Sequence, residues 1–439
     1  MRRYYIRTMG CQMNEYDSDY VGRILMKSGF QPTDNPHDAD LILINTCTVR
    51  AKAHQKAYSL LGRMVSLKKR RPALILGLMG CIAQQEGSGL IERFPYLDLV
   101  MGTRQIGRIS QFIEQIDKKH ERVVATKLLR LPYTSDNSGY FKGRVKSQIS
   151  IMQGCNNYCS YCIVPYVRGG EISRSPREIL EEARHLISEG VREITLLGQN
   201  VNSYCSTGIE KIDFPGLLKK LNDLEGLMRI RFTTSHPKDL TEDLIHCFHD
   251  LDKLCPHIHL PFQAGSNNVL ERMNRRYTRE KYMELVGALR RTRPNLAITS
   301  DVMVGFPGET DNDFQMTLDL IRKIEFDNLF SFKYSDRKGT SAERMDQKIE
   351  ENEKKSRLEI LQKTQKEITL KKNRGRIGNL EEVLVEGESK KGGQLTGRTL
   401  TNIIVNFDYK NNMIGKIAKV IIEDAFVNSL RGTCLGKAD

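Results

Sequence analysis

Ile149-Ser-Ile-Met-Gln-Gly-Cys155-Asn-Asn-Tyr-Cys159-Ser-Tyr-Cys162 joins a short apolar run to a loop that carries three cysteines at the spacing C-x3-C-x2-C. The apolar run, residues 148–152, predicts a β-strand, and Gly154 gives the chain room to turn directly before the first cysteine. Ligands of α/β proteins bind beyond the carboxyl ends of the strands. The stretch therefore predicts an α/β fold with a cysteine site at a strand end.

Three thiolates on one loop can each bind one iron of a four-iron cluster and leave the fourth iron without a protein ligand. That iron can chelate the amino and carboxylate groups of a methionine moiety, which places a sulfonium sulfur beside a source of electrons. A zinc site is the alternative, but zinc motifs usually contain paired C-x2-C units or histidines at helical spacing. Neither accompanies Cys155, Cys159 and Cys162, so we predict a catalytic, open [4Fe-4S] cluster here.

Strand and helix patterns alternate from residue 147 to residue 345, which predicts a series of β/α units. Ser175 followed by Pro176 is typical of a helix start, and Gly190 of a helix end. Six successive units without a reversal favour a complete or partial (β/α) barrel over an open sheet. The expected strands are 148–152, 193–197, 228–233, 257–260, 298–304 and 328–332.

The chain on either side of this region predicts further domains. Residues 1–120 alternate apolar runs (4–9, 41–45, 73–79, 97–101) with helical patterns (15–28, 50–67, 104–118), which indicates an α/β domain with a parallel sheet. Residues 121–146 are polar and basic and predict a linker, and residues 346–374 predict a helical connector. Five short strands within 375–438 (382–386, 395–399, 403–407, 417–423, 426–430) predict a small β-barrel, which can hold nucleic acid or serve only as a structural appendage.

Three further cysteines, Cys11, Cys47 and Cys81, each follow a predicted strand of the first domain. Neighbouring parallel strands end at the same sheet edge, so we expect the three thiols to point into one crevice. Three ligands again suit a [4Fe-4S] cluster with an open iron, and unrelated buried thiols are the alternative. Cys205, Cys247, Cys255 and Cys434 are expected to be ordinary thiols, although Cys205 lies close to a strand end.

Polar residues and turns mark other strand ends of the central region. Gln199 and Asn200 follow one expected strand, and Gln263 and Ser266 follow another. These four side chains are either cofactor or substrate contacts or satisfied loop groups. Gly305-Phe-Pro-Gly308 predicts a turn after a third strand, and such a turn by itself is a common loop sequence and only a weak sign of function.

Composition restricts the class of protein and its partners. Hydrophobic residues make up 39% and charged residues 28%, and no apolar run approaches the ~18 residues of a membrane span. The amino terminus has no apolar stretch typical of a signal peptide, so we expect a cytoplasmic protein in which disulfides are rare. The net charge is +14; residues 41–85 hold eight Lys or Arg and no acidic residue, and residues 118–146 hold eight against two. This distribution favours a nucleic-acid partner over a merely solvated surface.

The motifs resemble known proteins along nearly the whole chain. The spacing C-x3-C-x2-C with Tyr161 before the last cysteine is the signature of radical S-adenosylmethionine enzymes. Gly10-Cys-Gln-Met-Asn14, Asn45-Thr-Cys-Thr-Val-Arg50, Gly80-Cys-Ile-Ala-Gln84 and the match from Gln153 to Arg174 resemble the methylthiotransferases of that superfamily. The carboxy-terminal segment is similar to a TRAM domain, an RNA-binding β-barrel. Met9 and the segment 335–339, which lacks the usual prolines, are small departures from the family pattern.

The resemblance implies two [4Fe-4S] clusters and S-adenosylmethionine as cofactors. The Cys155/Cys159/Cys162 cluster would generate a 5′-deoxyadenosyl radical, and the Cys11/Cys47/Cys81 cluster would carry the sulfur. The turn with Gly305 and Gly308 would pack the cofactor adenine. Within the family, Gly10–Asn14 and Leu197-Gly-Gln-Asn-Val-Asn-Ser-Tyr204 resemble the branch that methylthiolates C2 of N6-isopentenyladenosine at tRNA position 37. The implied partners are the tRNA anticodon stem-loop, a reductant and a sulfur donor, and we expect a monomer.

Other functions remain as alternatives at this point. Sister branches of the family act on threonylcarbamoyladenosine or on a ribosomal-protein aspartate. A non-catalytic Fe–S RNA-binding protein or redox sensor would need closed, four-ligand clusters, whereas both triplets lack a fourth cysteine.

Overall fold

The computed structural model describes residues 1–48, 51–129, 139–207, 211–389, 392–409 and 413–437. The chain forms two compact units. The first contains Met1–Lys142, Gln148–Asn156 and Ile163–Ile172, and the second contains Gly143–Ser147, Asn157–Cys162 and Ser173–Asp439. The start of the expected helix 50–67 and the middle of the basic stretch 118–146 fall outside the described residues. No helix within the described ranges is long and apolar enough to cross a bilayer.

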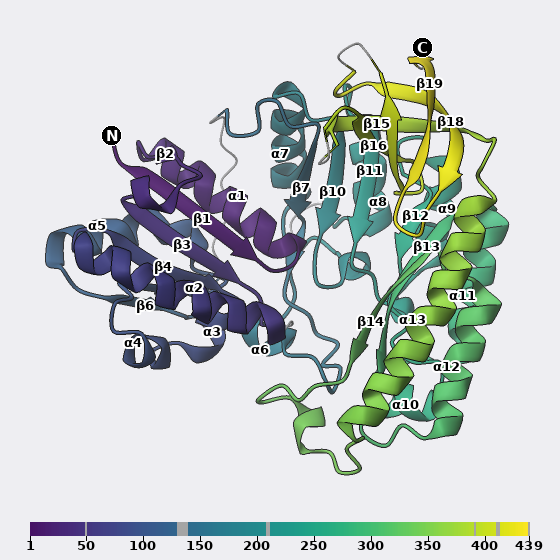
Figure 1. The fold of residues 1–439 in the computed structure, drawn as a ribbon, viewed down its shortest axis with the longest axis horizontal. Helices are drawn as coiled ribbons and strands as arrows, with labels where there is room; N and C mark the ends of the chain where they lie inside the picture. Colours follow the sequence, from purple (N-terminus) through teal and green to yellow (C-terminus); the bar gives the residue numbers. More distant parts are fainter. Residues whose placement is uncertain (49–50, 130–138, 208–210, 390–391, 410–412, 438–439) are drawn as a thin grey trace. The chain divides into compact units, whose positions relative to one another are not determined.

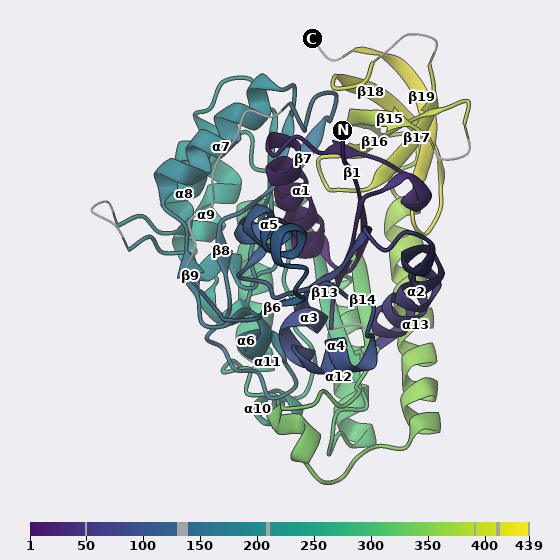
Figure 2. The same ribbon diagram turned by 90° about the vertical axis from the view of Figure 1, so that its left-hand side faces the viewer.

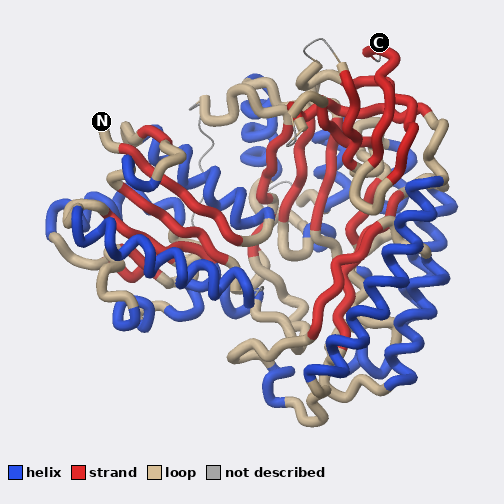
Figure 3. The backbone as a smooth tube through the Cα atoms, viewed as in Figure 1, coloured by secondary structure: helices blue, strands red, loops and turns tan. Residues whose placement is uncertain are grey.

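A six-stranded parallel sheet forms the centre of the first unit (Figures 1 and 3). Its strands lie in the order β2-β1-β3-β4-β5-β6. β2 is added on one side of β1 and β3 to β6 on the other, so the strand order reverses between β1 and β3. The bounds are β1 Arg3–Met9, β2 Gln31–Pro32, β3 Leu41–Thr46, β4 Ile75–Gly80, β5 Leu99–Met101 and β6 Val123–Ala125. All four expected strands are present. β2 and β6 are additional, and β6 pairs with β5 from within the segment expected to be a linker.

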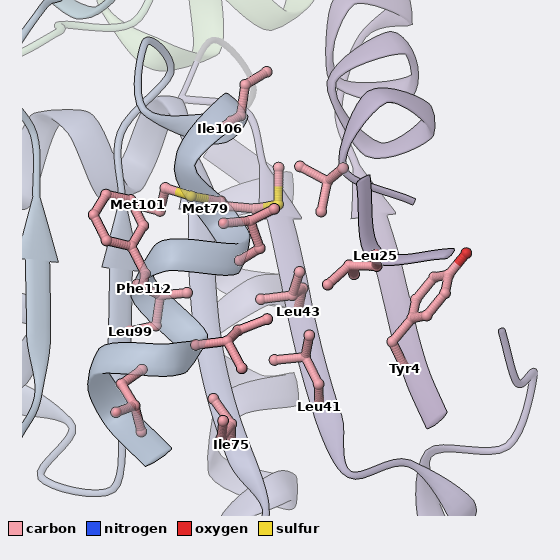
Figure 4. Packing of buried hydrophobic residues seen from close by; sticks show 14 of the residues in the cluster. Tyr4, Leu25, Leu41, Leu43, Ile75, Met79, Leu99, Met101, Ile106 and Phe112 are labelled. Carbon is pink, nitrogen blue, oxygen red and sulfur yellow. The ribbon is translucent and has the colours of Figure 1, made fainter. Parts of the chain in front are cut away.

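Side chains of the central strands alternate between two apolar layers, because successive residues of a strand point to opposite faces. In β3, Leu41 and Leu43 belong to one layer and Ile42 and Ile44 to the other. Figure 4 shows the first layer, in which Phe112 of the covering helix lies beside Met101 of the sheet. Helices α1 Gln12–Lys27 and α5 Ile109–Lys119 cover that layer, and α2 Ala51–Arg70, α3 Cys81–Glu86 and α4 Gly89–Arg93 cover the other.

The central region contains two three-stranded sheets, in the orders β11-β10-β7 and β12-β13-β14. β10 pairs with β11 in parallel, as β13 does with both of its neighbours. Their strands are β7 Lys146–Ser150, β10 Glu193–Leu197, β11 Arg229–Thr233, β12 His257–His259, β13 Ala297–Val304 and β14 Asn328–Lys333. Among the described residues, an isolated bridge of Ile230 with Leu254 links β11 to the segment before β12, and no longer ladder joins them. The predicted partial barrel of β/α units is therefore confirmed, with its ladder interrupted at the middle.

Helices follow these strands as the helix signals predicted. Ser175 caps α7 (Pro176–Ser188) by accepting a hydrogen bond from the Glu178 backbone N–H at 3.2 Å. The long helix α13 lies along β14 (Figure 1). Just before that strand, the Phe326 carbonyl accepts a hydrogen bond from the Gln365 side chain at 2.8 Å. The bounds are α6 Val164–Arg168, in the first unit, and α8 Phe214–Asn222, α9 Glu242–Asp250, α10 Asn267–Arg272, α11 Arg279–Thr292, α12 Asp311–Ile324 and α13 Glu351–Arg374.

The end of the chain forms a closed five-stranded barrel in the order β15-β16-β17-β19-β18 (Figure 2). Its strands are β15 Leu380–Glu388, β16 Leu395–Thr399, β17 Ile404–Asp408, β18 Ile417–Ala425 and β19 Leu430–Lys437. The expected strand 426–430 is wrong: Phe426 N–H bonds the Ser429 carbonyl at 2.9 Å in a turn, and the last strand begins only at Leu430. Barrel, central region and amino-terminal sheet together confirm the predicted fold class.

Two buried arginines of β11 join the barrel to the central region. Arg229 donates to the carbonyls of Arg398 and Glu382 at 2.6 and 3.0 Å. Arg231 donates to the carbonyls of Leu400 and Thr399, both at 2.9 Å. Charge-assisted hydrogen bonds of this kind are stronger than neutral ones, so the contact is a specific one and not only an apolar one.

Candidate active site

The register of the first sheet brings the strand ends that carry Cys11, Cys47 and Cys81 to one edge. Met9 at the end of β1 pairs with Thr46 of β3, and Thr46 pairs with Gly80 of β4. Cys47 and Cys81 come directly after paired residues, and Cys11 follows one turn residue later as the N-cap of α1. The edge includes the point between β1 and β3 where the strand order reverses, which is where open α/β sheets bind ligands.

The three thiols influence one another's protonation, as expected for side chains that meet. A hydrogen bond with Cys47, aided by the charge of Arg168, lowers the pKa of Cys11 to about 6. A hydrogen bond with Cys47 also lowers the pKa of Cys81, whereas the bonds with both neighbours raise the pKa of Cys47. Cys47 and Cys81 are buried and Cys11 is exposed. The arrangement therefore favours thiolates, the form that binds iron, at two of the three positions.

Two asparagines of the cysteine motifs hold these strand ends in place. Asn14 Nδ2 donates to Asn45 Oδ1 at 3.0 Å, and Asn45 Nδ2 donates to the Asn14 carbonyl at 2.8 Å. Asn14 Oδ1 accepts from the Cys11 backbone N–H at 3.3 Å. Both asparagines are fully buried, so the bonds couple the start of α1 to the end of β3.

A buried ion pair that the sequence reasoning missed lies beside this cysteine group. Arg168 Nη2 donates to Asp17 Oδ2 at 2.7 Å, and the two side chains are 3% and 0% exposed. Burial alone would lower the pKa of Arg168, but the charges of Asp17, Cys81 and Cys11 raise it above its ordinary value, so the guanidinium stays charged. Asp17 and Arg168 are far apart in sequence, and only the quoted match from Gln153 to Arg174 contained Arg168.

The loop of the second triplet is held tightly at its base. Gly154 has φ +82°, and a Cβ there would lie 2.1 Å from the Gly170 carbonyl oxygen and 2.4 Å from that of Gly169. The Cys155 N–H bonds the Gly169 carbonyl at 3.1 Å. Asn156 and Glu171 exchange two hydrogen bonds between backbone N–H and side chain, each 3.1 Å long. The segment that enters the loop therefore runs against the segment that leaves it.

The other end of this loop packs within the second unit. Arg275 Nη1 donates to Cys159 Sγ at 3.5 Å, and Arg275 is 4% exposed. The Ser160 N–H bonds the Met273 carbonyl at 3.0 Å, and the Tyr161 ring meets Phe306 edge-on at 6.5 Å between centroids. Arg275 is a second buried cation next to a proposed ligand that the sequence reasoning did not single out.

The remaining predicted site residues have mixed surroundings. Asn200 is 1% exposed and bonds Asp239 through Nδ2 at 2.7 Å, while its Oδ1 has no hydrogen-bond partner among the described residues. Gln199 lies next to it and is half-buried. Ser266 Oγ donates to Asp313, which already satisfies it. Gln263 has φ +65°, and its backbone bonds β13 through Asp301 O and Met303 N.

Gly305 and Gly308 lie where other chain segments approach closely. A Cβ at Gly305 would lie 2.3 Å from Lys354 Cγ, and one at Gly308 would lie 2.6 Å from the Arg272 guanidinium carbon. The Gly305 N–H also bonds Glu309 Oε2 at 2.5 Å. Both glycines thus have a structural reason to be present, whatever they contact in a complex.

Cysteine thiolates are the ligands of iron–sulfur clusters, so the donors of both triplets are of the kind that such a cluster takes. Within the described ranges, no three His, Cys, Asp or Glu side chains are arranged to hold one ion. A zinc ion needs its ligands within about 2.3 Å of one point, whereas cluster cysteines each bind a different iron. All ten cysteines are thiols without disulfides.

Models of three protein families match this chain in sequence. Residues 3–102 match the uncharacterized protein family UPF0004, residues 149–321 the radical SAM superfamily, and residues 375–435 the TRAM domain. The superfamily match implies a [4Fe-4S] cluster and S-adenosylmethionine as cofactors. The fold is similar to that of the radical S-adenosylmethionine methyltransferase TsrM from Kitasatospora setae, with a TM-score of 0.55, 15% identity and coverage of 75% of this chain and 73% of that one.

Curated relatives match over nearly their whole length. A protein of Syntrophus aciditrophicus (strain SB) is 49% identical over 99% of this chain and 95% of its own. A protein of Geobacter sulfurreducens is 46% identical over 98% of this chain and 96% of its own. Both are named tRNA-2-methylthio-N(6)-dimethylallyladenosine synthase, which does not favour the sister branches or a redox sensor. The chain is therefore an enzyme of the radical SAM superfamily and belongs to the tRNA-2-methylthio-N(6)-dimethylallyladenosine synthase family.

Proposed function

We propose that this enzyme adds a methylthio group to C2 of N6-isopentenyladenosine at position 37 of tRNA. The observation that carries the proposal is the meeting of Cys11, Cys47 and Cys81 at one sheet edge, in a chain that also carries the C-x3-C-x2-C loop. The names of the full-length relatives support the same substrate.

The reaction needs cofactors because the adenine C2–H is not acidic and no side chain can remove it as a proton. S-adenosylmethionine and a reduced [4Fe-4S] cluster supply a carbon radical that abstracts such a hydrogen atom. In this chain, Cys155, Cys159 and Cys162 would hold that cluster, and the tightly closed base of their loop would fix its position. Cys11, Cys47 and Cys81 would hold the other [4Fe-4S] cluster, which carries the sulfur. The thiolate form that binds iron is favoured at Cys11 and Cys81.

Two substitutions separate the duties of the two triplets. Cys159→Ala should abolish release of 5′-deoxyadenosine and formation of the methylthio product together. Cys81→Ala should spare cofactor cleavage and stop only thiolation. Reconstituted protein should bind about eight irons, and either variant about four, since each cluster contains four. Unmodified protein that bound only about four irons would refute the two-cluster proposal.

Six residues are proposed as contacts of S-adenosylmethionine: Gln199, Asn200, Gln263, Ser266, Gly305 and Gly308. Asn200 is the best supported of them, because its buried Oδ1 has no hydrogen-bond partner within the described part of the chain. A buried acceptor without a partner costs about 1–3 kcal/mol, which a bound amino or hydroxyl group would recover. Asn200→Ala should therefore raise the Kd for S-adenosylmethionine about tenfold without changing the iron content.

The tRNA would be held by basic surface as well as by the barrel. Arg7, Lys56 and Arg63 line a surface groove over β1 and α2 in the first unit, and α2 contains no acidic residue. A group of cations beside a helix without acidic residues suits RNA phosphates. Protein with Lys56→Ala and Arg63→Ala should bind tRNA more weakly, and the slope of log Kd against log salt should fall by about 0.7–0.9 for each phosphate that is no longer neutralised.

Lys118 provides the matched control for this test. It is equally basic and exposed, but it is paired with Glu114 at 2.5 Å, so Lys118→Ala should leave the slope unchanged. Equal slopes in all three proteins would refute the groove as a phosphate site.

A separate reductant and a separate sulfur donor are required, and the protein would act as a monomer in the cytoplasm, where its tRNA substrate is found. The decisive experiment is nucleoside mass spectrometry of tRNA from cells that lack this protein. The 2-methylthio nucleoside should disappear and N6-isopentenyladenosine should accumulate; unchanged 2-methylthio content would refute the substrate.

A further inference from the structure

The ion pair of Arg168 and Asp17 is incompletely satisfied although it is buried. Arg168 Nη2 bonds Asp17 Oδ2 at 2.7 Å, but Nη1 of the arginine and Oδ1 of the aspartate have no hydrogen-bond partner in the part of the chain that the structure describes. Leaving a buried charged group without a partner is expensive, and native proteins nearly always satisfy such groups. The unpaired N–H therefore points to an acceptor that the described residues do not provide.

The surroundings of Arg168 indicate what that acceptor is. Arg168 ends α6, and its neighbour Val167 packs with Ile163 against Cys81 in one apolar cluster. Asp17 lies on α1, the helix that Cys11 caps. Helix α6 also packs against α3, the helix that begins at Cys81, so Arg168 lies beside two of the three segments that carry the cysteines. Sulfur in anionic form is the acceptor chemistry available at this place.

We propose that Arg168 is a positioning residue for anionic sulfur at the Cys11/Cys47/Cys81 site: its unpaired Nη1 donates to sulfur bound there, and Asp17 holds the guanidinium in place. The inference rests on the proposed cluster at these three cysteines and adds a residue that is not a ligand. Arg168 stabilises negative charge at the site, both the electron added on reduction and the charge of an incoming hydrosulfide.

The two partners should shift the reduction potential of the site in opposite directions. Arg168→Gln removes a cation and should lower the potential, because reduction then adds charge beside an uncompensated Asp17. Asp17→Asn keeps the cation, removes the anion and should raise the potential. A purely structural role predicts the same direction for both, since each substitution breaks the same hydrogen bond. Arg168→Lys keeps the charge and should stay close to the unmodified protein.

The test uses full-length protein in which Cys155, Cys159 and Cys162 are all alanine. Iron can then bind only at the site of Cys11, Cys47 and Cys81. After anaerobic reconstitution, the potential is measured by redox titration followed by electron paramagnetic resonance, and sodium sulfide is the probe for sulfur binding. Half-saturation by sulfide should need a concentration on the order of tenfold higher in Arg168→Gln, the loss of one charge-assisted hydrogen bond. The double variant Asp17→Asn with Arg168→Gln removes both charges and provides a comparison if the single variant folds poorly.

The outcomes separate this inference from the proposal beneath it. About four irons per chain together with unchanged potential and unchanged sulfide binding in Arg168→Gln and in the double variant would overturn the role of Arg168 alone. A shift of the same sign in Arg168→Gln and Asp17→Asn would also overturn it. A triple-alanine protein that bound no iron, with Arg168 intact, would overturn the two-cluster proposal and this inference with it.

Discussion

Gly154→Ala should release the loop that carries Cys155, Cys159 and Cys162 and should leave the site of Cys11, Cys47 and Cys81 intact. An alanine at φ +82° costs about 1–2 kcal/mol, because the left-handed region brings Cβ too close to the backbone. Its Cβ would also lie 2.1 Å from the Gly170 carbonyl oxygen, and a backbone atom cannot rotate away as a flexible side chain can. The shift needed would break the bond from Cys155 N–H to Gly169 O, worth about 1 kcal/mol. We expect a total loss of roughly 2–4 kcal/mol, concentrated at the loop.

Gly190→Ala is the matched control for the backbone strain. Gly190 has φ +105°, and no described atom lies within 4 Å of the position of its Cβ, so the same substitution there adds strain without a collision. Its cost should stay near 1–2 kcal/mol.

The assay compares urea unfolding, iron content and 5′-deoxyadenosine release in the two variants. Gly154→Ala should bind about four irons, all at the first site, and lose cofactor cleavage, whereas Gly190→Ala should keep about eight. Equal destabilisation of both variants with full iron in Gly154→Ala would show that the close approach at the loop base is not needed.

Three further predictions test other parts of the structure. Arg231→Met should destabilise the protein by about 3–5 kcal/mol in denaturant unfolding, because it leaves the buried Glu193, 3.0 Å away, without its cation. Adding Glu193→Gln should restore part of the lost free energy of unfolding. Additive effects of the two substitutions would contradict the pairing. Burial and the charge of Arg275 lower the pKa of His236 to about 2, below the ~6.5 of an unfolded chain. Stability from this residue is thus complete above pH 6.5 and falls by about 1.4 kcal/mol per pH unit below it, and His236→Gln should flatten that slope in unfolding measured from pH 7 to 5. Asn14→Ala should weaken iron retention at Cys11, Cys47 and Cys81 about 10–100-fold in a chelator competition, as loss of a supporting hydrogen bond does at metal sites. Unchanged iron retention would refute the supporting role of Asn14.

Long, strongly periodic elements could be predicted from the sequence because their signals are local. β3 and the start of α7 follow from an apolar run and from Ser175-Pro176, and both occur where expected. β6 did not follow, because three apolar residues in a basic segment are too few to distinguish from a linker, and only pairing with β5 makes them a strand. The turn at Phe426–Ser429 resembles a strand in sequence because it begins with two apolar residues, although Asn428 and Ser429 favour turns.

The same difference applies to the candidate site. The six cysteines could be singled out because thiols at strand ends form a visible pattern, and the structure brings Cys11, Cys47 and Cys81 together. Arg168 and Arg275 could not, because an arginine has no local signature and its role depends on partners more than a hundred residues away. The proposed contacts of S-adenosylmethionine stay predictions.

The two cysteine sets differ in how much of the chain must be ordered before they exist. Cys155, Cys159 and Cys162 span eight residues, so closing their loop costs little chain entropy. Cys11, Cys47 and Cys81 meet only when β1, β3 and β4 have paired in register, a non-local arrangement that forms slowly. We therefore expect iron to load in a fixed sequence during maturation, first on the local loop and later at the sheet edge. Iron bound at Cys11, Cys47 and Cys81 would then report that the amino-terminal sheet is complete.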